Sequence, residues 1–150
     1  MIKIIPIKEN YFYHKNIPSI FHDVEHARYY YCVSCNGVVL FKFSMQSEIK
    51  PTVMSSDDVI IIGFDQVVAF FCLKDNKLTK KLELSSFFYN FEIDERYVFI
   101  VCEVEVIILI RETLEEYKCI DFFDYIDHVK LGQDEVLVYL VDGSIESVSI

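Results

Sequence analysis

The residues best suited to hold a metal ion lie near the start of the chain. His22 and His26 precede a Cys-X-X-Cys pair, Cys32 and Cys35, which is followed by Asn36-Gly37. Two thiolates beside a tight turn can point at one zinc ion, which proteins usually hold through four such ligands. A zinc site built from two such Cys-X-X-Cys turns needs a second pair, and the chain has none. His22 and His26 would have to share one face of a helix, which the surrounding residues do not favour. We therefore predict no metal or cofactor site and keep zinc at these four side chains as the alternative.

Residue patterns that would indicate an enzyme are missing. The glycines are scattered, so no glycine-rich phosphate loop is present, and there is no Gly-X-Ser-X-Gly motif. His14 and His128 could act as general bases, but each lies beside charged residues in a predicted loop or edge strand. Cys72 and Cys102 lie in the most apolar segments, where the thiolate form is disfavoured. We predict that the protein is not an enzyme and has no catalytic residues.

The segment Asp121–His128, DFFDYIDH, is the strongest candidate for a binding surface. Its aspartates recur every three residues with large aromatic residues between them. Interfaces favour aromatic anchors, and an acidic rim attracts basic partners. Arg111–Glu116, RETLEE, is a second acidic stretch. The alternative is that the aromatic rings enter the core and the carboxylates are merely solvated. The predicted partner-binding residues are Asp121, Phe122, Asp124, Tyr125, Asp127, Glu112, Glu115 and Glu116.

Four similar segments must position these residues, each with a polar or acidic start, an apolar strand, a tight turn and a second apolar strand. The segments are Tyr29–Phe43, Asp57–Leu73, Asp94–Ile110 and Asp134–Ile150. Asn-Gly and Asp-Gly are strong hairpin signals because both residues tolerate positive φ. The four turns are predicted at Asn36-Gly37, Asp65-Gln66, Glu103-Val104 and Asp142-Gly143.

Further strands flank these hairpins. Leu78–Leu84 and Leu114–Ile120 are partly polar, as is typical of outer strands whose charges oppose pairing with another sheet. Phe87–Ile93 and Ile126–Gly132 precede the third and fourth hairpins. The result is a four-strand unit of about 38 residues, close to the roughly 40-residue period of propeller blades.

The central strands read as continuous apolar runs: VIII, VFIV, VIILI and VLVYLV. A strand of a two-sheet sandwich would alternate, because one of its faces meets water. Sheets stacked around an axis cover both faces. We predict an all-β fold in which one domain, residues 1–150, forms a compact propeller-like array of about four small antiparallel sheets. A two-sheet β-sandwich or an incomplete propeller is the alternative, since Ser44–Ser56 shows no clear strand pair.

The two ends of the chain suggest how such a ring could close. The fourth segment stops after its second hairpin strand, and the N-terminal MIKIIPI is a spare strand. We expect this N-terminal strand to supply the missing outer strand, between the first and the last sheet.

Charge is unevenly distributed along the chain. The net charge is −10, and residues 82–150 hold sixteen Asp and Glu against four Lys and Arg. This balance argues against direct binding of nucleic acid and favours basic protein partners. No apolar run approaches the roughly 18–20 residues of a membrane span, and the start is a poor secretory signal. With five cysteines, an odd number, we expect a cytoplasmic protein without a disulfide framework.

Small, acidic, cytosolic proteins without a catalytic motif resemble the immunity proteins of bacterial toxin–immunity pairs, including contact-dependent growth inhibition systems. The repeats VIIIGFDQVVAFFCL and VFIVCEVEVIILI resemble propeller hairpins. The resemblance implies a monomer that neutralises a cognate basic toxin in a tight one-to-one complex, and it assigns no residue. A nuclease is the natural target because its nucleic-acid cleft must be positive. A propeller-like protein–protein interaction scaffold is the alternative.

Overall fold

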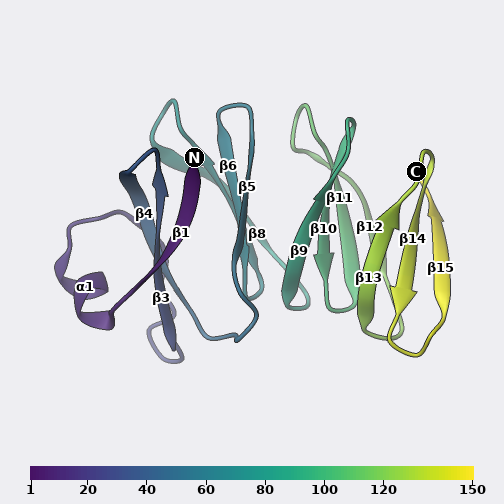
Figure 1. The fold of residues 1–150 in the computed structure, drawn as a ribbon, viewed down its shortest axis with the longest axis horizontal. Helices are drawn as coiled ribbons and strands as arrows, with labels where there is room; N and C mark the ends of the chain where they lie inside the picture. The colour runs from purple at the N-terminus through teal and green to yellow at the C-terminus, as the bar shows by residue number, and fades with distance from the viewer. The chain divides into compact units, whose positions relative to one another are not determined.

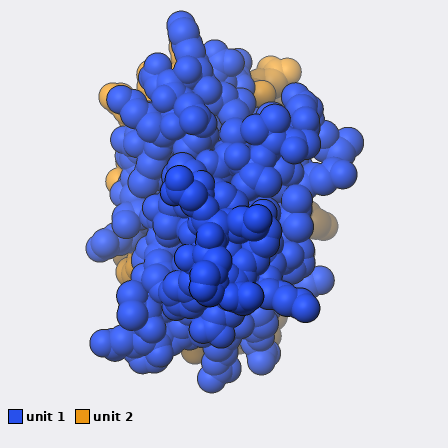
Figure 2. Space-filling view, turned by 90° about the vertical axis from the view of Figure 1, so that its left-hand side faces the viewer, with its two compact units in different colours: residues 1–83 blue, residues 84–150 orange.

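The computed structural model describes all 150 residues, which form fifteen strands and one helix of six residues (Figure 1). The strands make four small sheets, so the predicted propeller-like array is confirmed and the two-sheet sandwich is wrong. The chain divides into two compact units, Met1–Glu83 and Leu84–Ile150, which Figure 2 colours separately. No helix is long and apolar enough to cross a membrane.

Unit 1 contains sheets 1 and 2. Sheet 1 has the order β1-β3-β4-β2, and β2 runs parallel to β4 while the other pairs are antiparallel. Sheet 2 has the order β5-β6-β7-β8 and is antiparallel throughout. The elements are β1 Ile2–Ile7, α1 Glu9–His14, β2 Ser19–Phe21, β3 Tyr29–Cys35, β4 Val38–Met45, β5 Thr52–Ser56, β6 Val59–Phe64, β7 Val67–Cys72 and β8 Lys77–Glu83.

Unit 2 contains sheets 3 and 4. Sheet 3 has the order β9-β10-β11-β12, whereas sheet 4 has only three strands, in the order β13-β14-β15. The elements are β9 Phe88–Ile93, β10 Tyr97–Cys102, β11 Glu105–Ile110, β12 Glu116–Asp121, β13 Ile126–Leu131, β14 Glu135–Leu140 and β15 Ile145–Ser149. Successive strands pair as antiparallel neighbours within each sheet.

All four predicted hairpins are present, as β3–β4, β6–β7, β10–β11 and β14–β15. Asn36 and Gly37 have φ values of 50° and 83°, as a two-residue hairpin turn of the favoured type requires. Gly143 has a φ of 91° in the last turn. The segment Ser44–Ser56, whose sequence shows no clear strand pair, contains β5, the first strand of sheet 2.

The prediction that the N-terminal strand completes the last sheet is wrong. β1 pairs with β3 of sheet 1, from Ile2 opposite Cys35 to Ile7 opposite Tyr30. The N-terminal segment also supplies β2 at the other edge of the same sheet. Sheet 1 is therefore completed at both edges by residues that precede its own hairpin, and the edge of sheet 4 formed by β15 has no fourth strand.

Helix α1 covers part of the outer face of sheet 1, the face that points away from sheet 2. Phe41 and Phe43 point into the core shared by the two sheets, so Lys42 between them points to the other face. The Lys42 ammonium group is buried there and donates to the carbonyl oxygens of Phe12 and Lys15 at the end of α1. Phe12 itself is buried against Tyr30 of β3. The helix thus covers side chains on the outer face of sheet 1.

Sheet 4 does not follow the expectation that every central strand is covered on both faces. In β14, Val136, Val138 and Leu140 are buried in the core shared with sheet 3, whereas Leu137 and Tyr139 between them are only half-buried. The apolar sequence VLVYLV conceals this alternation, because Leu and Tyr count as apolar wherever they point. Tyr139 is instead covered by polar neighbours: His128 stacks on its ring at 4.3 Å and the Lys130 ammonium lies 5.3 Å from the ring centre.

Two buried carboxylates fix the linkers that lead into sheets 2 and 3; we call these the carboxylate clamps. Asp65, in the β6–β7 turn, accepts the backbone N–H groups of Gln46 and Ser47, each at 2.9 Å. Glu105, directly after the β10–β11 turn, accepts the N–H groups of Ser85 and Ser86 at 3.0 and 3.2 Å. The side chains of Asp65 and Glu105 come from equivalent hairpin turns and bind equivalent linkers, so the clamp is a repeated feature of sheets 2 and 3.

Candidate functional site

The linker into sheet 4 differs from these two, and it carries the first group of predicted binding residues. We call Asp121–Asp127 the acidic loop. Backbone hydrogen bonds hold its two sides: Phe122 N–H donates to the carbonyl of Val104 at 2.8 Å, and Ile126 N–H donates to that of Glu103 at 2.7 Å. No carboxylate clamp reaches the loop from the β14–β15 turn, where Asp142 binds Ser144 instead. The middle of the loop can therefore project outward.

The three aromatic residues of the loop have different environments. Phe122 is buried, at 7% exposure, in the core between sheets 3 and 4. Phe123 is fully exposed, and Tyr125 is 54% exposed. Val141, whose N–H donates to the Tyr125 carbonyl at 2.9 Å, is exposed as well. Phe122 anchors the loop from beneath, and Phe123 is the aromatic ring most available to a partner, although the sequence singled out Phe122.

The aspartates surround these rings. Asp121 is exposed at the end of β12, and Asp127 is exposed at the start of β13, where its carboxylate lies 2.6 Å from Nδ1 of His128. Asp124 is half-buried and accepts the N–H of Tyr125 at 2.8 Å. Exposed apolar rings beside carboxylates can bind the side chains of a protein that presents both apolar and basic groups.

The second group of predicted residues lies elsewhere. Glu112 and Glu115 are exposed in the loop between β11 and β12, and Glu116 is exposed as the first residue of β12. Asp121 is the last residue of the same strand, so the two groups lie at opposite ends of β12, roughly 17 Å apart at 3.3 Å per residue. The structure therefore brings together the aspartates and Tyr125 but does not bring the glutamates to them.

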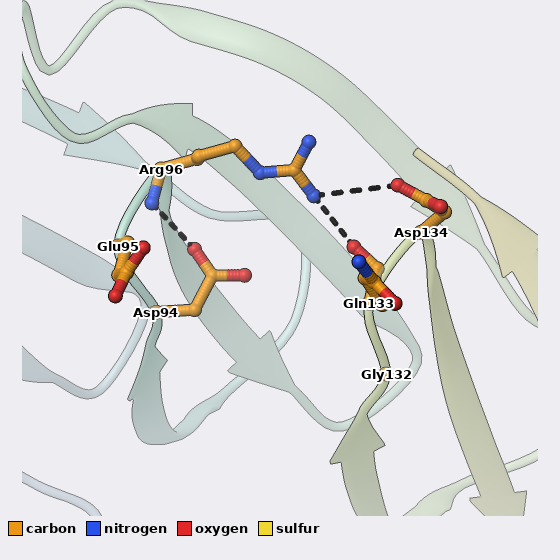
Figure 3. A pocket seen from close by; sticks show the side chains of 6 residues that line it. All are labelled: Asp94, Glu95, Arg96, Gly132, Gln133 and Asp134. Atoms are coloured by element: carbon orange, nitrogen blue, oxygen red, sulfur yellow. Dashed lines mark hydrogen bonds and ion pairs between the residues drawn. The ribbon is translucent and has the colours of Figure 1, made fainter.

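A shallow pocket of about 340 Å³ lies in unit 2 between the turns that join β9 to β10 and β13 to β14 (Figure 3). Arg96 crosses it: its guanidinium donates to the Gln133 carbonyl at 2.6 Å and lies 3.8 Å from the Asp134 carboxylate. Asp94 accepts the Arg96 backbone N–H at 2.8 Å. The guanidinium is already bound to the β13–β14 turn. Arg96 therefore links sheets 3 and 4 at the end away from the acidic loop, and the pocket has no free cationic group.

The side chains weighed as zinc ligands do not form a cluster. His22 binds the Ser44 hydroxyl at 2.7 Å through Nδ1, and His26 is exposed beside Asp23. Cys32 is buried within β3, while Cys35 ends the strand beside the turn. His22 and Ser44 do not form a nucleophile–base pair open to substrate, because Ser44 is fully buried.

One trio of potential ligand atoms does converge, from Glu105, Cys119 and Asp121, within 4.8 Å of one another. The Glu105 carboxylate is already engaged, since it also accepts the Ser85 hydroxyl at 2.7 Å. Burial, followed by repulsion from the Glu105 carboxylate, raises the pKa of the Cys119 thiol to about 11. Burial likewise raises the pKa of Cys102. Both thiols stay protonated near neutral pH, which makes them poor nucleophiles.

No protein-family model matches this sequence, and no curated protein is similar to it. Solved structures do resemble it. The C-terminal WD40 domain of Sif2 superimposes with a TM-score of 0.62 at 16% identity, over 81% of this chain and 40% of that one. The β-propeller domain of Cps50 (Swd1) from Myceliophteria thermophila gives 0.54 at 18% identity, over 71% and 36%. The fold is that of β-propeller sheets.

The designed protein Ika4 offers a comparison of similar length. It superimposes with a TM-score of 0.59 at 13% identity, over 91% of this chain and 92% of that one. By contrast, the chain spans well under half the length of the Sif2 and Cps50 structures. At these identities the likeness concerns the fold, and the chemistry must be argued from this chain's own residues.

Proposed function

We propose that the protein is a non-catalytic interaction module that binds a basic protein partner through the acidic loop. The observation that carries this proposal is the exposure of Phe123, which stands fully in water beside Tyr125 and the aspartates. A Phe side chain gains about 1.5–3 kcal/mol when it is moved from water into an apolar site. By itself this gain corresponds to roughly a 10- to 150-fold increase in affinity.

The charge of unit 2 supports a basic partner. Residues 84–150 contain fifteen Asp and Glu but only four Lys and Arg, whereas residues 1–83 contain nine and ten. The field around unit 2 is thus strongly negative, which attracts cations and repels anions such as nucleic acid. Such a field raises the association rate with a basic protein, and salt reduces the effect.

Propeller sheets are a suitable support for such a loop, because rigid strands on both sides hold it in place. A basic toxin, with a nuclease as the natural example, is one partner class that the charge would suit. A propeller-type scaffold that holds a basic subunit or peptide would suit it equally, and it agrees better with the fold. Both versions require the same surface, so one set of variants tests them.

The test compares two triple variants that each remove three negative charges. Asp121→Asn, Asp124→Asn and Asp127→Asn alter the acidic loop, whereas Glu112→Gln, Glu115→Gln and Glu116→Gln alter the opposite end of β12. Proteins captured from the source cells by the wild type are purified and titrated calorimetrically against each variant. We expect the loop variant, and separately Phe123→Ser, to weaken binding at least tenfold, while the glutamate variant binds nearly as the wild type.

A purified partner that binds the loop variant and Phe123→Ser with wild-type affinity would exclude the acidic loop as the binding site. Equal weakening by both triple variants would show that net charge, and no particular surface, determines the binding. Circular dichroism of each variant checks that its sheets are intact.

A further inference from the structure

Sheet 4 lacks a strand that its sister sheets possess. In sheets 2 and 3, the second hairpin strand (β7 or β11) pairs on its outer side with β8 or β12. The corresponding strand of sheet 4 is β15, and it pairs only with β14. The outer edge of β15 is therefore a position that a fourth strand occupies elsewhere in the same molecule.

The hydrogen-bond pattern shows which backbone groups this edge offers. Leu140 N–H donates to the Ser144 carbonyl, and Ile150 N–H donates to the Asp134 carbonyl. Hydrogen-bonded pairs alternate along an antiparallel ladder, so the N–H and C=O groups of the even-numbered residues of β15 point toward β14. The N–H and C=O groups of Ile145, Ser147 and Ser149 consequently face away from it. Of these, the Ser149 carbonyl accepts the Lys118 ammonium at 2.9 Å.

The surroundings of this edge are suited to a strand. On the face toward sheet 3, Ile120 of β12 and Val148 and Ile150 at the end of the chain are only half-buried, although they pack on the core. A further strand beside β15 would cover these side chains and add to the apolar area removed from water. Ile145, on the opposite face of the strand, is 55% exposed.

Glu146 indicates the charge of the strand that would fit. It lies opposite Val138 of β14 and on the same face of β15 as Val148, the face toward sheet 3. Glu146 is exposed, so a basic residue beside it on an added strand would form a cross-strand ion pair.

We propose that β15 accepts an extended segment of a partner protein as a fourth, antiparallel strand of sheet 4. The segment places an apolar residue beside Val148 and, two residues further on, a basic residue beside Glu146. This mode of binding combines backbone hydrogen bonds with alternating side-chain contacts. The site uses the edge of β15 and no side chain of the acidic loop, so it does not depend on the proposed function.

A synthetic peptide with the sequence of β8, KLTKKLE, is the probe, because it fills the same position in sheet 2 and contains the pattern apolar–X–basic. The protein labelled with ¹⁵N is titrated with this peptide. We expect the N–H signals of Ile145, Ser147 and Ser149 to shift and to exchange more slowly with solvent. Unchanged β15 signals at saturating peptide would overturn the proposal.

Ser147→Pro removes one outward N–H without touching the bonds to β14, since proline is tolerated at such edge positions. We expect it to lower peptide affinity at least fivefold, or about the value of one strand hydrogen bond. Cys119→Pro is the matched control: the Cys119 N–H points outward from β12, because the bonded pairs of that ladder include Phe122 with Val104. Equal affinities for the two proline variants would also overturn the proposal.

Charge reversal gives a second, independent test that does not alter the backbone. Glu146→Lys should weaken KLTKKLE and strengthen KLTEKLE, and failure of this exchange would contradict the assigned register. Light scattering reports whether the protein is a dimer without peptide. A dimer whose β15 amides are already protected would show that a second copy, and not a basic partner, fills the edge. Phe123→Ser should leave the peptide titration unchanged, so the two binding sites can fail separately.

Discussion

The two carboxylate clamps allow a prediction that depends on single oxygen atoms. In the Glu105 clamp, both backbone N–H groups, from Ser85 and Ser86, donate to the same oxygen, Oε1. In the Asp65 clamp, the two N–H groups donate to different oxygens, from Gln46 to Oδ2 and from Ser47 to Oδ1. Replacing each acid by its amide keeps one acceptor oxygen and turns the other into an NH₂ group.

The expected costs follow from this difference. Glu105→Gln keeps both backbone bonds to Oε1, while the Ser85 hydroxyl, which donates to Oε2, must turn to accept from the new NH₂ group. The variant then loses mainly the assistance of the charge, at a cost of about 1 kcal/mol. Asp65→Asn must leave one N–H facing an NH₂ group, at a cost of about 2 kcal/mol or more. Glu105→Ala removes every bond and leaves a hole, because Glu105 is only 3% exposed, and should cost about 3 kcal/mol.

Urea unfolding followed by far-ultraviolet circular dichroism measures these values, since the chain contains no tryptophan. In thermal melts each kcal/mol lowers the Tm by roughly 2–4 °C in a chain of this size. We therefore expect Glu105→Gln to melt nearest the wild type, followed by Asp65→Asn and then Glu105→Ala. If Glu105→Gln is as damaging as Asp65→Asn, the assignment of both N–H groups to one oxygen is refuted.

Two further predictions concern Lys42 and Cys119. Lys42→Met keeps the buried stem but leaves the carbonyls of α1 without their ammonium donor, and should cost about 2 kcal/mol in urea unfolding. Hydrogen exchange in α1 should accelerate, with Lys50→Met at an exposed position as the control; a helix as protected as in the wild type would contradict this role. Since the Cys119 pKa rises from 9.0 to about 11, its alkylation rate should keep rising with pH to near 11. The raised pKa also means that this thiol stabilises the fold below pH 9 and loses that contribution as pH rises through 11. An alkylation rate that levels off near pH 9 would refute the raised pKa.

The hairpins could be predicted because their signals are local. Asn36-Gly37 and Asp142-Gly143 favour positive φ, and the flanking residues are apolar, so each hairpin is determined within about 17 residues of sequence. The N-terminal segment carries no comparable signal. Helix α1 has no side-chain cap at Lys8, and β2 is a three-residue strand that pairs with β4 across more than twenty residues. These elements form because sheet 1 offers them an edge and a face.

The place of the candidate binding residues in the fold was predictable in part, for a similar reason. The spacing of Asp121, Asp124 and Asp127 pointed to the acidic loop, and the structure does gather them. Glu112, Glu115 and Glu116 were predicted as a second acidic stretch, and the length of β12 separates them from the aspartates. Phe122 is buried and Phe123 is exposed, and the Phe122 N–H bonds to Val104 in the preceding turn, a contact between distant residues that no local pattern encodes.

The clamps also bear on how such a chain can grow. Asp65 and the linker it binds both lie between Gln46 and the end of β8, and Glu105 and its linker both lie between Ser85 and the end of β12. A duplication of either stretch would copy the carboxylate together with the N–H groups it binds, so the new sheet would already contain its own clamp. The first and last sheets lack this property, since one depends on α1 and the other on an unclamped loop. Duplication of the stretch that contains sheet 2 or sheet 3 is therefore the simplest way to lengthen the array.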